Sequence, residues 1–585
     1  MEILRVSTFL CRRLVMTDDR GTPRPGWDAQ ATPPGTDARG TSPLRDERSE
    51  GNRRDGIRRV TAGVAGGAVL IAAVTVLARV AGFGRWLVFA EAVERSCLGT
   101  AYATANLVPN IVFEVVAGGA LAAAVVPLVA SARQAGGEEL RAVASALLSW
   151  TLLVLVPVAA VTAAAAVPLM HALVTHPDGC DSAAVAETAS RMFAVFAPQI
   201  PLYGVAVVLG GILNAHRRFL AAALAPLVST LVVTGAYVAF LGYDGDRSDL
   251  GRLPLRWELV LSVGTTLGVL ALTLPGGVGV ASLRLGLRPT LRFPRGVAAR
   301  ARGLATAGLA GLLAQQLTLL VVVVVTGRVE GGVLVYTWAW AVFLLPWAVL
   351  AVPVATSAFA ALSEHEAAGR GERFACTNAA ATRAVLLVSG LGAGVVAGTA
   401  HPVARMFLGS DDPVGRSMLA RALLALAPGL LGYGLVALCS RSLYASGASR
   451  TAAFATVVGW LVAAGCSAGL AGALDDRALV AGVAAAHSAG FTLAALLQLA
   501  EVRRRCGTAS LHGAIRACAA ALLGAVAAGL AAWAVADLFT PQGKVANAVL
   551  AAGAAGAGTL AFGLVTATVD GKDVRELVSR RWGRA

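Results

Sequence analysis

Two arginines stand alone in the first long apolar stretch of the chain. Residues 60–90 contain no charged side chain except Arg79 and Arg85. Because about 20 apolar residues already cross the hydrocarbon core of a bilayer, this stretch is typical of a membrane-spanning helix. A charge inside such a helix costs at least about 2.5 kcal/mol, so it is retained where it faces a polar cavity, a partner or an anionic ligand. Arg79 and Arg85 are therefore the first candidate site residues.

The geometry of one helix leaves a second interpretation open for both arginines. A helix over 60–90 extends about 46 Å, which exceeds the ~30 Å hydrocarbon core, so either side chain can instead snorkel to a headgroup. The two residues are six positions apart, or about 120° around a straight helix. A bend at Gly82 or Gly84 would bring both toward one cavity.

The composition predicts an all-α polytopic membrane protein. Of 585 residues 57% are apolar and only 14% are charged, whereas soluble domains carry about 25% charge. The net charge of +15 does not indicate nucleic-acid binding, because the arginines concentrate in the N-terminal tail and in short connections, where they set membrane topology.

Fourteen apolar runs predict fourteen transmembrane helices. They lie near 60–90, 98–130, 142–174, 187–213, 219–242, 257–283, 303–326, 332–362, 384–409, 422–440, 451–474, 478–500, 517–536 and 545–569.

The connections between these runs alternate in charge. Arginines mark those near 133–141, 216–218, 284–302, 370–373, 441–450 and 503–516. Acidic residues mark those near 91–94, 178–181, 244–249, 330, 411–412 and 475–476. The positive-inside rule places the first set in the cytoplasm, so both termini are predicted to be cytoplasmic, as an even helix count requires.

The chain resembles itself at an offset near 230 residues. FAPQIPLYGVAVVLGGILNA (196–215) matches LAPGLLGYGLVALCSRSLYA (426–445), with shared Pro and Tyr-Gly positions, and VPLMHALV (167–174) echoes HPVARMFL (401–408). Duplication of six helices predicts two lobes of the same orientation around a central cavity, with two helices appended.

The predicted organisation follows from the repeat and the composition. Residues 1–55, rich in Arg, Asp, Gly, Pro, Ser and Thr, form a disordered cytoplasmic tail. The first lobe covers 56–300, the second 301–505, the appended helices 506–570, and a short cytoplasmic tail 571–585.

The eight cysteines contain no CxxC pair, and we interpret them as small apolar or loop residues and not as a disulfide framework or a metal site. One loop gathers side chains that can bind metal, and we interpret it as an exposed polar loop; its members are His171, His176, Asp178, Cys180 and Asp181. We expect no metal and no bound cofactor.

The first two predicted helices carry motifs of a known family. After Arg79, Gly82, Phe83 and Arg85 come Pro109 and Asn110, and then Gly119, Ala120, Leu121, Ala124, Val126 and Pro127. This pattern resembles the opening of the MurJ/MviN family, the lipid II flippases of the MOP exporter superfamily. The fourteen helices, the two lobes and SLYASGASRT (442–451) fit the same family.

The resemblance implies an alternating-access flippase for an undecaprenyl-pyrophosphate-linked peptidoglycan precursor in the bacterial plasma membrane. A pyrophosphate dianion requires fixed positive charge, and Arg binds phosphate through two planar hydrogen bonds. The predicted substrate-binding residues are Arg79, Arg85, Asn110, Gln315 and Gln316. The glutamines instead serve as interhelical hydrogen-bonding groups in the alternative interpretation. Glu114 is a counter-ion or a coupling site, and transport is coupled to an ion gradient or the membrane potential.

Several charged positions of the family are missing here. Thr100 stands where the family commonly has Asp, and Phe113 and Gly118 stand at the Arg and Glu positions of the second helix. Ala341 and Leu344 stand at the corresponding positions of the eighth. The second lobe therefore lacks its share of a cationic cavity.

Three functions remain open at the level of sequence. They are a lipid II flippase, a flippase for another undecaprenyl-linked saccharide, and a non-transporting membrane scaffold that binds cell-wall synthesis or division proteins. No paired catalytic carboxylates, nucleophile–base constellation or phosphate-binding Gly loop favours an enzyme.

Overall fold

The computed structural model describes residues 74, 77–93, 96–115, 125, 128–129, 131–133, 136–174, 179–216, 218–293, 297–408, 412–539, 541 and 543–569. The two predicted tails, Gly118, the motif over 119–124, Pro127, His176 and Asp178 lie outside these residues.

The first bundle, here called the N-lobe, begins with an unlabelled helix over 77–93. It continues with α3 (Cys97–Val115), α5 (Gly137–Ala164), α6 (Ala166–Leu173), α7 (Ser182–Phe196), α8 (Gln199–Ala215), α9 (Phe219–Phe240), the short η2 (Leu250–Arg252) and α10 (Leu255–Ala281).

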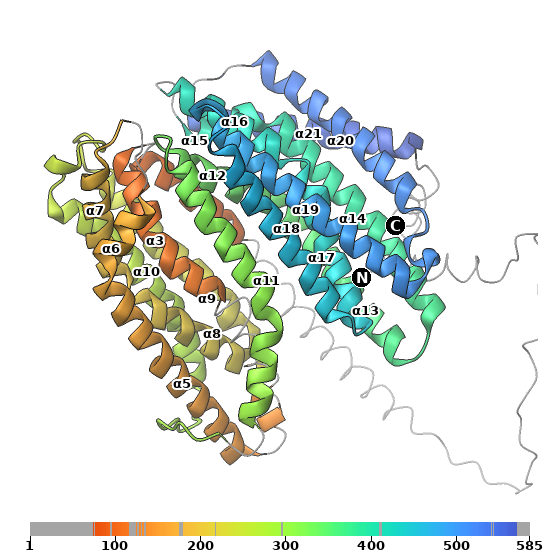
Figure 1. Cartoon of the computed structure of the whole chain (residues 1–585), viewed down its shortest axis with the longest axis horizontal. Coiled ribbons are helices and arrows are strands. Elements are labelled where there is room, and N and C mark those ends of the chain that lie inside the picture. Colours follow the sequence, from red (N-terminus) through yellow and green to blue (C-terminus); the bar gives the residue numbers. More distant parts are fainter. Residues whose placement is uncertain are drawn as a thin grey trace, which may run out of the picture.

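The second bundle, the C-lobe, contains α11 (Val297–Thr326), α12 (Gly332–Pro346), η3 (Trp347–Ala351), α13 (Val352–Ala367), α14 (Gly371–Gly398), α15 (Ala400–Phe407), α16 (Pro413–Leu426), α17 (Gly429–Ala445), α18 (Ser449–Leu470), α19 (Asp476–Cys506) and η4 (Thr508–Leu511). A terminal pair, α20 (Ala514–Leu538) and α21 (Lys544–Val569), packs on α14. Figure 1 shows the two bundles, with α11 and α12 between them.

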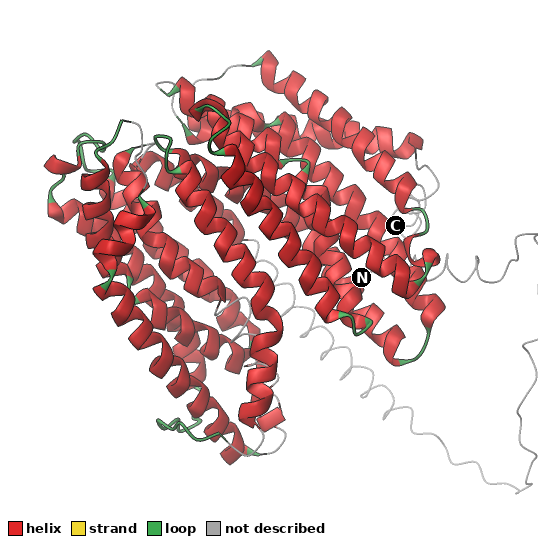
Figure 2. Ribbon diagram, in the orientation of Figure 1, coloured by secondary structure: helices red, strands yellow, loops and turns green. Residues whose placement is uncertain are grey.

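The predicted all-helical membrane fold is confirmed. Each of the fourteen apolar runs contains a helix, and the described part of the chain has no strand (Figure 2). Among the described residues, 10 helices are long and apolar enough to cross a membrane, or up to 11 if the pair α16 and α17, bent by 44°, is one span. Of the remaining runs, the seventh contributes a shorter apolar helix, 310–326 in α11.

The internal repeat recurs in the helix lengths. α5 and α14 both have 28 residues, α6 and α15 both have 8, α8 and α17 both have 17, and α9 and α18 both have 22. Pro198 immediately precedes α8, and Pro428 immediately precedes α17. Proline lacks an N–H and clashes with the preceding turn, so each lobe has a helix interrupted at this proline. The C-lobe pair α16 and α17 is bent by 44°, whereas Ser182–Ala215 in the N-lobe counts as one span.

The two lobes share a hydrophobic core at one end only. We call the end that carries Asp181, Asp249 and Glu330 the outer end and the opposite one the inner end. The largest cluster of buried residues joins both lobes toward the outer end and includes Phe89, Leu334 and Phe407. Toward the inner end, one cluster contains described residues of the N-lobe alone and another those of the C-lobe alone. The lobes are therefore closed on the outside and separate on the inside.

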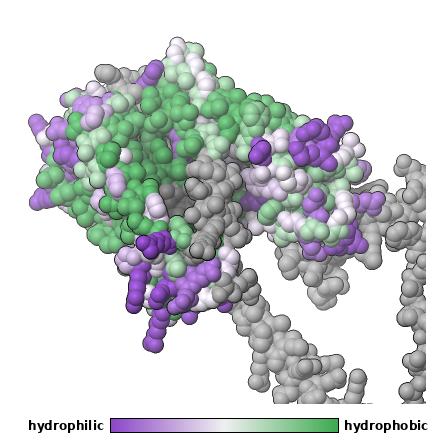
Figure 3. All heavy atoms as spheres, turned by 60° about the horizontal axis from the view of Figure 1, so that its bottom comes forward, coloured by the Kyte–Doolittle hydropathy of each residue, from purple (hydrophilic) through white to green (hydrophobic). Residues whose placement is uncertain are grey.

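The surface matches a protein solvated by lipid. Large apolar side chains such as Val154, Leu267 and Val526 are 51%, 49% and 62% exposed. Figure 3 shows hydrophobic residues over much of the visible surface, with hydrophilic residues gathered in patches at its edges. In a bilayer these side chains contact lipid hydrocarbon and not water, so their exposure carries no hydrophobic cost.

Candidate functional site

Arg85 is the half-buried cation of the helix over 77–93. Its guanidinium carbon lies 5.2 Å from the centroid of the Trp86 ring, a distance at which a cation–π attraction operates. Its Nε is buried and has no hydrogen-bond partner among the described residues. Arg79, by contrast, is exposed. Of the two predicted arginines, Arg85 thus has a donor held inside the protein and available to a ligand.

A cluster of hydroxyl groups lies near Arg85. The Tyr102 hydroxyl is 2.8 Å from the Tyr237 hydroxyl and 2.7 Å from Oγ1 of Thr265, which ties α3 to α9 and α10. Arg85 lies within electrostatic range of Tyr102, Tyr203 and Tyr237. Sequence analysis missed these tyrosines; the available signal was a phenol group inside an otherwise apolar run.

The helix break before α8 adds a second polar group to the N-lobe interior. Gln199 is fully buried, and its Nε2 donates to Oγ1 of Thr266 at 3.0 Å. Its Oε1 has no partner in the described part of the chain. One turn further, the ring of Tyr203 lies 4.5 Å from that of Phe113.

Asn110 and Glu114 are exposed on the inner part of α3. The structure gives Glu114 no ion pair with Arg79 or Arg85, as far as the described residues show. Glu114 instead lies within electrostatic range of Tyr433 on α17, in the opposite lobe. Its predicted role as a counter-ion or coupling group stays a prediction, as does the substrate contact of Asn110.

The two glutamines of α11 differ in their surroundings. Gln316 is buried and its Nε2 has no described partner, whereas Gln315 is half-buried. Two residues on, Thr318 donates to the carbonyl of Trp460 at 2.9 Å and so fastens α11 to α18. A neighbouring threonine thus makes an interhelical bond here, and both interpretations of the glutamines stay predictions.

The corresponding interior of the C-lobe is aromatic. The rings of Trp340, Tyr433, Trp460, His487 and Phe491 lie within 4.5–6.5 Å of one another. The uncharged positions Ala341 and Leu344, both half-buried, lie on the same helix as Trp340. The structure thus agrees with the sequence that this lobe contributes no cation at those positions.

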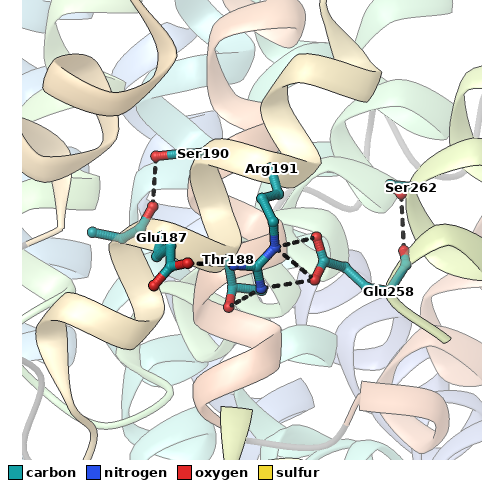
Figure 4. A network of polar contacts seen from close by, with 7 residues as sticks. Glu187, Thr188, Ser190, Arg191, Glu258 and Ser262 are labelled. Atoms are coloured by element: carbon teal, nitrogen blue, oxygen red, sulfur yellow. Dashed lines mark hydrogen bonds and ion pairs between the residues drawn. The ribbon is translucent and has the colours of Figure 1, made fainter. Parts of the chain in front are cut away.

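An ion pair that the sequence did not predict crosses the outer half of the N-lobe (Figure 4). Arg191 of α7 donates from Nε and Nη2 to the Glu258 carboxylate of α10 at 2.9–3.2 Å. The same guanidinium reaches Glu187 at 3.0 Å and Thr188 at 3.2 Å. Glu258 is only 3% exposed, so the pair satisfies a buried charge. Both residues sit in predicted apolar runs, where the argument applied to Arg85 would also have singled them out.

A disulfide at the outer end corrects the interpretation of the cysteines. Cys97 at the start of α3 is bonded to Cys180 before α7, with a Cα–Cα distance of 5.8 Å. The expectation that no disulfide forms was wrong, because the two residues are 83 positions apart and only the tertiary fold brings them together. Cys180 is thereby unavailable to a metal, and no metal-binding cluster occurs within the described ranges.

The N-lobe also contacts the C-lobe and the terminal pair. Glu91, at the outer end of the first helix, forms an ion pair with Lys544 at the start of α21. The rings of Phe83 and Phe407 meet edge to face at 5.9 Å. A Cβ added to Gly179 would lie 3.3 Å from Glu330 of the other lobe. An ion pair, an aromatic pair and the close approach of Gly179 to the Glu330 side chain thus hold the outer end closed.

Comparison with known proteins agrees with this architecture. A family model described as the lipid II flippase MurJ matches residues 89–552. A probable lipid II flippase MurJ of Rhizobium tropici is 27% identical over 290 residues, which are 49% of this chain and 52% of that protein. The lipid II flippase MurJ of Burkholderia cenocepacia is 28% identical over 381 residues, or 63% of this chain and 71% of that protein. The chain thus spans about half the length of the first relative.

Two solved structures share the fold. A lipid II flippase MurJ in an inward closed conformation has a TM-score of 0.66 at 17% identity. The match covers 87% of this chain and 100% of that chain. An inward-facing multidrug resistance transporter of the MATE family, in the MOP superfamily, has a TM-score of 0.59 at 16% identity, covering 76% and 99%. At these identities the likeness establishes the two-lobed fold alone.

Proposed function

The chain belongs to the family of the lipid II flippase MurJ, and from that premise we propose that it moves lipid II from the inner to the outer leaflet by alternating access. The family and the helices make it a multi-span protein of the bacterial inner membrane. Its substrate is lipid-linked and reaches it from the bilayer.

Arg85 is the observation that carries the proposal. It is a permanent cation in the first apolar run, with a buried Nε that has no partner among the described residues, and such a donor is costly unless a ligand accepts it. The hydroxyls of Tyr102 and Tyr237, bonded to each other, lie within electrostatic range of it. A pyrophosphate fits this group because arginine offers bidentate, charge-assisted hydrogen bonds to phosphate oxygens.

The closed outer end supports alternating access. The lobes share a core toward the outer end and have separate cores toward the inner end, which is the arrangement expected of an inward-facing state. A substrate that binds the alternative state more tightly shifts the population toward it. The contacts between Glu91 and Lys544 and between Phe83 and Phe407 are those that the outward-facing state has to release.

The placement of the arginines supports cytoplasmic termini. They mark the inner connections, as the positive-inside rule requires of the cytoplasmic side. The energy for net transport then comes from an ion gradient or the membrane potential.

The test is complementation in bacteria depleted of their own flippase. We expect the wild-type chain to restore growth and outward movement of lipid II, and Arg85→Ala to fail at equal membrane abundance. Arg292→Ala, an exposed inner position, is the matched control and should complement. A wild-type chain that inserts normally and moves no lipid II would contradict the proposal and favour another undecaprenyl-linked saccharide or a scaffold role.

A further inference from the structure

An apolar cleft runs along the outside of the C-lobe, between α19 and the terminal helix α20. Its volume is about 1380 Å³, and its walls include Leu435 of α17, Leu496 and Leu499 of α19, and Leu522 and Val526 of α20. α14 forms the floor and contacts both α17 and α20. The cleft is thus the space between α19 and α20, which are consecutive long helices, above α14.

The cleft opens to the lipid-facing surface. Leu496 is 58% exposed, Leu522 50% and Val526 62%. Residues of α20 line it from Ile515 to Trp533, a rise of about 27 Å, which is close to the ~30 Å hydrocarbon core. Because the medium at this depth is hydrocarbon, an acyl chain and not water fills such a space.

Among the described residues that line the inner mouth of the cleft, Arg503 is the cation. Three arginines end α19, and Glu501 forms ion pairs with two of them, Arg504 at 2.7 Å and Arg505. Arg503 makes no ion pair among the described residues and lines the cleft together with Thr508 of η4. The third guanidinium of the row is therefore left for a ligand that sits in the cleft.

We propose that the inner part of this cleft binds an anionic phospholipid of the cytoplasmic leaflet. Arg503 and the Thr508 hydroxyl receive the headgroup phosphate, and an acyl chain lies between Leu499 and Leu522. Arginines next to a membrane span attract anionic lipid headgroups. The proposal uses the proposed orientation, with the inner end in the cytoplasm, but it is independent of which substrate is transported.

Native mass spectrometry of the full-length protein with added phosphatidylglycerol or phosphatidylcholine tests the headgroup contact. We expect the wild type to retain phosphatidylglycerol about fivefold more strongly, the gain expected of one arginine at an anionic surface. Arg503→Gln should lose this preference, and Arg504→Gln, with the same charge change one residue away, should keep it. Equal retention of both lipids by the wild type would overturn the proposal.

A steric variant tests the chain contact. Leu522→Trp fills the cleft, whereas Leu523→Trp changes a neighbour that is 55% exposed and lies outside it. We expect only Leu522→Trp to reduce phosphatidylglycerol retention, by a factor similar to Arg503→Gln. Retention of undecaprenyl phosphate with no phosphatidylglycerol would also overturn the proposal, since the cleft would then hold an isoprenoid. Lipid II translocation, measured separately, reports on the proposed function and not on this site.

Discussion

The two lobes match in the lengths of four helix pairs and differ in their interiors. Tyr203 and Tyr433 occupy equivalent places after equivalent prolines. Around Tyr203 the N-lobe gathers Arg85, Gln199 and hydroxyl groups, whereas Tyr433 packs on Trp347 at 4.7 Å and on Phe491 at 4.5 Å. Duplication therefore preserved the helix lengths and the break, while the chemistry of each interior diverged.

The same divergence appears at the paired arginines Arg191 and Arg421, which head the repeated segments. Arg191 holds the buried Glu258. Arg421 on α16 is exposed and has no ion pair within the described ranges. The comparison shows a buried ion pair at this place in the N-lobe and an exposed arginine at the equivalent place in the C-lobe.

Loss of the outer disulfide should have the largest effect on stability. Cys97→Ser opens a bridge between residues 83 positions apart, which in the loop-entropy account costs about 4 kcal/mol. Cys466→Ser, a free exposed thiol of the C-lobe, is the control. The measurement is chemical denaturation in micelles, with and without reductant. Equal unfolding curves for wild type and Cys97→Ser would show that the disulfide does not stabilise the fold.

Arg191→Gln should destabilise the protein by about 3 kcal/mol, because it leaves a buried carboxylate without its partner. Arg421→Gln makes the identical change at the equivalent C-lobe position and should be within about 0.5 kcal/mol of wild type. Combining Arg191→Gln with Glu258→Gln should recover most of the loss. Similar free energies of unfolding for the two single variants would show that the lobes do not differ here.

Arg85→Ala should slow lipid II translocation in proteoliposomes by about 10- to 100-fold, the factor expected for one lost charge-assisted hydrogen bond. Arg85→Lys should recover part of the rate, since lysine keeps the charge and loses the bidentate geometry. Gln316→Ala in the C-lobe should change the rate far less. A larger loss of translocation rate in Gln316→Ala than in Arg85→Ala would show that the C-lobe, and not the N-lobe, holds the headgroup.

Tyr237→Phe should cost about 1 kcal/mol, because it removes a hydroxyl bonded to Tyr102. Tyr336→Phe is the matched C-lobe change and should be neutral or stabilising, because that buried hydroxyl has no partner among the described residues. Thermal unfolding in detergent distinguishes the two. A greater loss at Tyr336 would point to a polar partner in the C-lobe.

Much of the fold was predictable from sequence because hydrophobic length and charge alternation are local signals. The apolar runs gave a helix in every predicted place, and the Pro and Tyr-Gly positions revealed the repeat. The site was predicted only in part. Arg85 was found by its energetic anomaly, but the tyrosines around it come from α3, α8 and α9, and no local pattern brings these helices together.

The sequence by itself determined that this chain is a duplicated helical membrane protein with a cation in its first span, since apolar length, charge placement and internal similarity are all written locally. Only the tertiary structure decided that Arg85 is the more enclosed arginine, that Cys97 reaches Cys180, and that Arg191 pairs with Glu258 while Arg421 does not. These outcomes depend on contacts between residues tens of positions apart, which arise from helix packing and leave no periodic trace in the chain.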